Sequence, residues 1–119
     1  MYEDDADSRF ETAVRLAEDG LPTAAEALGS IAQDTGIDPD VRFEAAQRLT
    51  EFDPRRAVPA LRSIARDATI ESAIRLEAAQ RLTEVDPPQG AVALLYIIGD
   101  ATVDPDTRDE AVHLLTEVE

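Results

Sequence analysis

The feature that most constrains this chain is the return of the same residue types every 33 positions along its 119 residues. Leucine, glutamate and arginine recur at this interval; the arginine row consists of Arg9, Arg42, Arg75 and Arg108. A fixed interval of this size is typical of helical repeat proteins, in which neighbouring units cover one another's apolar faces. We therefore expect units at about residues 5–37, 38–70 and 71–103, followed by a half unit at 104–119.

Each unit carries two apolar stripes at helical spacing, which predicts two helices per unit. In the second unit, Asp38 and Pro39 form a start signal for the first helix, because an aspartate caps a helix and a proline is tolerated in its first turn. Because proline damages a helix interior, Pro59 places the start of the second helix near Arg56. We expect a single all-α domain over residues 1–119, folded as a right-handed α-solenoid of about 3.5 helix-pair repeats.

The second unit also carries a family pattern. It reads Asp-Pro-Asp-Val-Arg-Phe-Glu-Ala-Ala-Gln-Arg-Leu at 38–49 and Ala-Val-Pro-Ala-Leu at 57–61, and it closes on Asp67. This pattern resembles the bacterial HEAT-like repeat family, which includes the repeats of phycobilisome lyases. The resemblance implies a structural ladder of ion pairs and hydrogen bonds between units, made by an arginine early in the first helix and an aspartate that ends the second. By position these residues are Arg42, Arg75 and Arg108 with Asp34, Asp67 and Asp100.

The charge of the chain narrows the kinds of partner it can bind. Twenty-six acidic residues against 11 basic ones give a formal net charge of -15. Such a chain repels nucleic acid phosphates and anionic lipids, so we expect no nucleic acid and no membrane, but a neutral or basic protein. The absence of cysteine suits a reducing compartment, and the run at 91–98 is too short to span a bilayer, so we expect a cytoplasmic protein.

Residue types that carry out chemistry are sparse. His113 is the one histidine, no segment has the spacing of a calcium-binding loop, and no carboxylate pair accompanies a nucleophile. We therefore predict no catalytic residue, no metal and no cofactor, and a protein that is not an enzyme. The family resemblance leaves open an accessory subunit or chaperone of a lyase-type enzyme.

The second helices differ at the positions that line the concave surface of solenoids like this one. In the third unit these positions hold Val92, Leu95 and Tyr96, whereas the earlier units are polar or small there. A tyrosine beside a leucine is a typical anchor for a protein ligand, and Arg62 and Arg66 of the preceding unit would flank it. The alternative is that these residues are covered by a local rearrangement at the end of the array.

Leu114 occupies the position that arginine holds in the earlier units, at Arg15, Arg48 and Arg81. An apolar residue there predicts a contact: either a homodimer through the C-terminal end, or continuation into a longer array. For the chain as a whole we predict a non-enzymatic protein-binding scaffold or adaptor that uses its concave face. The high acidity also allows an acidic competitor of a basic protein.

Overall fold

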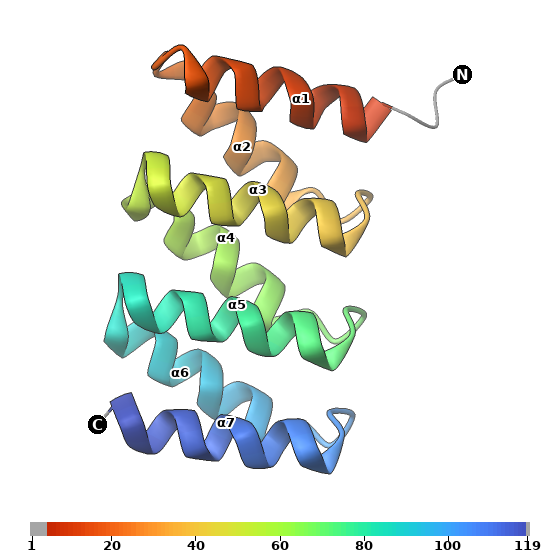
Figure 1. Cartoon of the computed structure of the whole chain (residues 1–119). Helices are drawn as coiled ribbons and strands as arrows, with labels where there is room; N and C mark the ends of the chain where they lie inside the picture. Colours follow the sequence, from red (N-terminus) through yellow and green to blue (C-terminus); the bar gives the residue numbers. More distant parts are fainter. Residues whose placement is uncertain (1–4, 119) are drawn as a thin grey trace. The chain divides into compact units, whose positions relative to one another are not determined.

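The computed structural model describes residues 5–118, which form seven α-helices and no strand (Figure 1). The all-α prediction is therefore confirmed. The helices that open successive units begin at Pro39, Ser72 and Pro105, so their starts keep the 33-residue spacing of the sequence. The helices are α1 (Asp5–Glu18), α2 (Thr23–Gln33), α3 (Pro39–Phe52), α4 (Pro54–Arg66), α5 (Ser72–Val85), α6 (Pro87–Ile98) and α7 (Pro105–Val118).

The residue contacts divide the chain into two compact units, one ending at Ala60 and the other beginning at Leu61. The division falls inside α4, so this helix contributes its first half to one unit and its second half to the other. The expected single domain and the right-handed superhelix stay predictions.

In the second compact unit, which begins at Leu61, α6 packs against both α5 and α7, and α5 also contacts α7. Figure 1 shows α5 and α7 in one layer and α6 in the other. The core between the layers consists of alanine, leucine and isoleucine side chains that are fully buried. Gly90 of α6 lies directly against α5: a Cβ atom there would lie 2.6 Å from the backbone nitrogen of Thr83. A glycine is therefore required at this contact.

The first repeat uses a different connection between its two helices, α1 and α2. Gly20 follows α1 with a φ of 71°, in the left-handed region that glycine favours. Its N–H donates to Ala17 O, and the N–H of Leu21 donates to Leu16 O. This pair of bonds is the Schellman arrangement that ends many helices. It replaces the aspartate-proline pair that separates the two helices of the later repeats.

The predicted start of α4 near Arg56 is wrong. The helix begins at Pro54, and Pro59 lies inside it. Pro54 suits the first helical position, and the backbone N–H of Arg56 already donates to Asp53 O at 3.1 Å. Pro59 lacks the N–H that would bond one turn back, but the packing of buried Ala57 and Ala60 in the same helix offsets that loss.

Candidate protein-interaction surface

Helix α6 carries the largest group of exposed apolar side chains. Of the five large apolar side chains that are most exposed in the described part of the chain, three lie on this helix. Val92 and Leu95 are 55% exposed and Tyr96 is 44% exposed, while Leu94 and Ile97 on the opposite face are fully buried. We call Val92, Leu95 and Tyr96 the α6 surface. Their spacing of three and four residues places them on one side of the helix.

Two arginines from the C-terminal half of α4 lie beside α6. The guanidinium carbon of Arg66 lies 5.1 Å from the centroid of the Tyr96 ring, a cation–π contact. Arg62 donates from Nη1 to Oε1 of Gln89, in the first turn of α6, at 3.3 Å. The structure thus brings the second helices of adjacent repeats together through residues that the sequence singled out, and it adds Gln89, which the sequence analysis missed.

The cation–π contact with Tyr96 leaves the N–H donors at the edge of the Arg66 guanidinium accessible to a ligand. A cation–π contact uses the face of the planar group, whereas its N–H donors point outward in the plane. In a chain with a net charge of -15, two neighbouring arginines are a local exception. The surface therefore offers apolar area next to donors that match a carboxylate.

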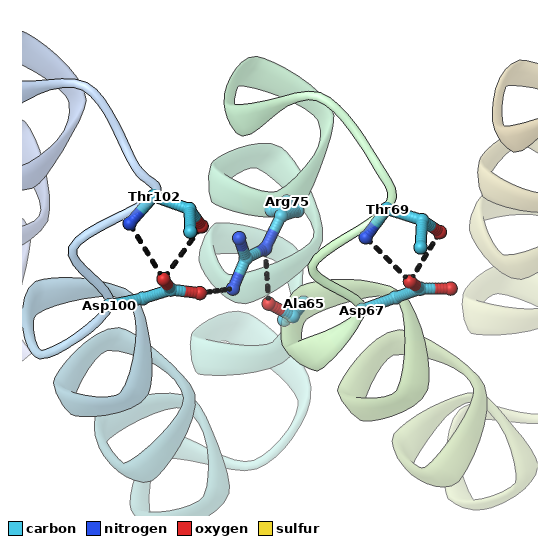
Figure 2. Close-up of polar contacts among 6 residues, drawn as sticks. All are labelled: Ala65, Asp67, Thr69, Arg75, Asp100 and Thr102. Atoms are coloured by element: carbon cyan, nitrogen blue, oxygen red, sulfur yellow. Dashed lines mark hydrogen bonds and ion pairs between the residues drawn. The ribbon is translucent and has the colours of Figure 1, made fainter.

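A different arginine, Arg75 of α5, lies inside the protein, away from the α6 surface. Its side chain is 1% exposed, and it bonds to two separate elements (Figure 2). Its Nε donates to the backbone oxygen of Ala65 in the last turn of α4 at 3.0 Å. Its Nη2 donates to Oδ2 of Asp100, just after α6, at 2.9 Å. Arg75 therefore connects three consecutive helices.

Asp100 is held in place by further donors. Its other carboxylate oxygen accepts from the Thr102 hydroxyl at 2.6 Å and from the Thr102 backbone N–H at 2.9 Å. These bonds, followed by the bond from Arg75, lower the pKa of Asp100 from 3.8 to about 2. Asp67 accepts the same two bonds from Thr69, as Figure 2 shows.

The arginine and aspartate rows meet in a register that position alone did not reveal. Arg9 pairs with Asp34 at 3.0 Å, just as Arg75 pairs with Asp100, so each of these two arginines reaches an aspartate 25 residues further on. The predicted ladder does not include Arg9. The bond from Arg9 and the backbone N–H of Gly36 lower the pKa of Asp34. Arg42 is buried and donates from Nε to Ala32 O at 3.0 Å.

The C-terminal helix exposes a residue that the sequence analysis did not single out. Leu114, the predicted self-association residue, is half-buried in α7, whereas Val112 is 45% exposed. His113 is well exposed, and its Nε2 lies 3.4 Å from Glu117. Within residues 5–118, no group of three or more histidine, aspartate or glutamate side chains is arranged to hold a metal ion.

The first compact unit, which ends at Ala60, contains an open hollow with a volume of about 500 Å³. It lies between α2 and the first half of α4, and its lining includes Glu26, Gln33 and Arg56. Its residues vary from repeat to repeat, so they give no pattern in the sequence. None of the described helices is both long enough and apolar enough to cross a membrane.

Helix pairs that repeat along the chain and are connected through buried arginines define a helical-repeat protein. A family model for HEAT repeats matches residues 37–116, so the chain belongs to the HEAT repeat family. This confirms the family resemblance and the α-solenoid class. Comparison with curated proteins and with solved structures gives no match. HEAT repeats are commonly protein-interaction scaffolds, and the family is typically non-enzymatic.

Proposed function

We propose that the chain is a non-enzymatic scaffold or adaptor that binds another protein on the α6 surface. The observation that carries this proposal is the exposure of Val92, Leu95 and Tyr96 on one side of α6, with Arg66 against the tyrosine ring. Exposed apolar groups of this kind, bordered by polar residues, mark interaction sites on soluble proteins. Tyrosine and arginine are also the residues that dominate binding energy at many interfaces.

The chemistry of the surface defines the ligand segment. One or two apolar side chains would pack on Val92, Leu95 and Tyr96, and a carboxylate beside them would bond to Arg62 and Arg66. The acidic chain as a whole favours a partner that is neutral or basic outside this segment. Docking would need little rearrangement, since the side chains are already exposed.

The test is a selection from a library of displayed helical peptides on the immobilised full chain. Selected peptides are then titrated against Leu95→Arg and against Leu21→Arg, an exposed leucine outside α6 that serves as a matched control. We expect binding to weaken at least tenfold for Leu95→Arg and to be retained for Leu21→Arg. Peptides that bind Leu95→Arg with the same affinity as the unchanged chain would refute the proposal, because the interaction would then lie outside the α6 surface.

The net charge of -15 supports a second candidate, an acidic competitor of a basic protein. Binding of this kind depends on long-range attraction, so it would weaken steeply between about 0.05 and 0.5 M salt. It would also be insensitive to Leu95→Arg. The same titrations repeated at two salt concentrations therefore separate the two candidates.

Self-association through Leu114 is a separate proposal, supported by the apolar replacement of an arginine position. Light scattering of the chain and of Leu114→Arg tests it. A dimer mass that falls to the monomer mass in the variant is the expected result. Equal masses for both chains would remove Leu114 from any self-interface.

A further inference from the structure

The hollow between α2 and the first half of α4 carries opposite charges on its two walls. On α2, Glu26, Gly29 and Gln33 follow at spacings of three and four residues, so they lie on one side of the helix. On α4 the wall includes Arg56, whose side chain is 54% exposed. Glu26 is exposed as well, and within residues 5–118 no ion pair joins it to Arg56. Both charges are therefore available to a ligand in the hollow.

The corresponding positions one repeat later are bridged by a side chain. Arg62 stands 33 positions after Gly29, and Gln89 stands 33 positions after Arg56. Arg62 donates from Nη1 to Oε1 of Gln89 at 3.3 Å, so its side chain connects α4 to α6. Between α2 and α4 the glycine supplies no side chain, and the opposite wall carries a guanidinium in place of the amide. The hollow thus lies where a bridging side chain is missing, and Arg56 is a donor that faces it.

The packing of α2 does not require a glycine at position 29. A Cβ atom there would meet only a side-chain carbon of Leu49, at 3.8 Å, which is an ordinary van der Waals contact. Glycine is the weakest helix former apart from proline, so most other residues would stabilise α2. Gly90 differs, because a Cβ atom there would overlap Thr83. Gly29 therefore lowers the stability of its helix and keeps the hollow open.

The charges on the two walls define the chemistry of a ligand. Arg56 can bind a carboxylate through two parallel hydrogen bonds, and Glu26 can accept from an ammonium or guanidinium group. Asp53 lies 3.4 Å from Nε of Arg56, which leaves the two terminal NH2 groups of the guanidinium for a ligand. Two copies of a chain with a charge of -15 repel each other, so a different polypeptide fits better than a second copy.

We propose that this hollow binds a segment of another polypeptide in which an acidic and a basic side chain stand close together. The acidic side chain fills the space opposite Gly29 and pairs with Arg56, and the basic side chain pairs with Glu26. Because the two ion pairs have opposite sign, they fix the direction of the bound segment. The hollow belongs to the compact unit that ends at Ala60, whereas the α6 surface belongs to the other unit. This proposal therefore does not depend on the function proposed above.

The probe is a phage-displayed library of short random linear peptides, selected on the immobilised full chain and depleted on Gly29→Gln. A glutamine at this position should accept from Arg56, which reproduces the bond between Arg62 and Gln89 with its two ends exchanged. Because glutamine is also a better helix former than glycine, Gly29→Gln should raise the urea midpoint by about 0.5 M. The same variant should lower the affinity of the selected peptides at least tenfold, measured by fluorescence anisotropy. Leu95→Gln introduces the same residue on the α6 surface and should leave that affinity unchanged.

Charge reversal tests the two ion pairs. Arg56→Glu should weaken binding of a selected peptide at least tenfold, and lysine in place of the peptide's acidic residue should restore it. Glu26→Lys should behave in the same way toward a peptide whose basic residue is replaced by glutamate. Circular dichroism of these variants should match that of the unchanged chain.

Three results would overturn the proposal. The first is a selection that leaves no peptide after depletion on Gly29→Gln, and the second is a failure of both charge reversals to restore binding. The third is a mass that doubles with the concentration of the unchanged chain but stays monomeric for Gly29→Gln, because a second copy would then occupy the hollow. Loss of peptide binding to the α6 surface alone would refute the function proposed above and leave this site intact.

Discussion

Replacing Arg75 with alanine should remove a large part of the free energy of unfolding of the second compact unit, which begins at Leu61. The side chain is 1% exposed and donates to Ala65 O at 3.0 Å and to Asp100 Oδ2 at 2.9 Å. Losing the donor to a buried carbonyl costs about 1 to 3 kcal/mol, and losing a charge-assisted bond costs about 1.5 to 3 kcal/mol. Asp100 is 15% exposed, so water recovers part of the second loss. We expect a net loss of about 3 kcal/mol.

Urea unfolding followed by circular dichroism measures this loss. With a urea slope of about 1.5 kcal/mol per molar, the midpoint should fall by about 2 M. Arg81→Ala is the matched control, since Arg81 lies on the same helix, is 48% exposed and should change the free energy of unfolding by less than about 0.5 kcal/mol. If the Arg75→Ala midpoint stays within about 0.5 M of the unchanged chain, Arg75 does not hold the helices together and the reasoning fails.

Three further results are expected. The pKa of Asp100 is lowered from 3.8 to about 2 in the folded chain, so the unfolded chain binds more protons between these pH values. The melting temperature should therefore fall as the pH drops from about 5 to about 2. This fall should be less steep for Asp100→Asn, which cannot bind the proton. Gly90→Ala should cost about 1 to 3 kcal/mol of unfolding free energy despite alanine's higher helix propensity, because its methyl group overlaps Thr83; an unchanged urea midpoint would contradict the close contact. Asp104→Ala should cost about 1 kcal/mol, measured in the same way, because the Asp104 carboxylate accepts bonds from the N–H and hydroxyl of Thr107 at the start of α7; a cost below about 0.3 kcal/mol would exclude a capping role.

The positions of most helices could be predicted from the sequence because the signals are local. Asp38 before Pro39 caps α3, and its carboxylate accepts a bond from the N–H of Asp40 at 2.9 Å. Because the sequence repeats every 33 residues, the same prediction extends to the other repeats. The predicted start of α4 near Arg56 is wrong because a proline does not always exclude a helix interior: Pro59 lies within α4 between the buried Ala57 and Ala60.

The pairing of arginine with aspartate could not be predicted from spacing alone. Both rows repeat every 33 residues, so every arginine stands at a constant separation from the aspartates before and after it. The choice depends on how the second helix returns along the first, which brings Asp34 to Arg9 and Asp100 to Arg75. Arg75 also donates to Ala65 O in the preceding helix α4, a contact with no signature in the sequence, since any residue supplies a backbone oxygen.

A repeat sequence provides its own control for deciding which exposed residues the fold requires. Val92, Leu95 and Tyr96 stand at positions that are polar or small in the earlier units. The earlier repeats fold with glutamate, glycine, serine, arginine or proline there, so stability does not require valine, leucine and tyrosine at these positions. An exposed apolar group also lowers solubility. The fold does not need these residues, and polar residues would be more soluble on that face, which supports the proposal that a protein ligand binds there.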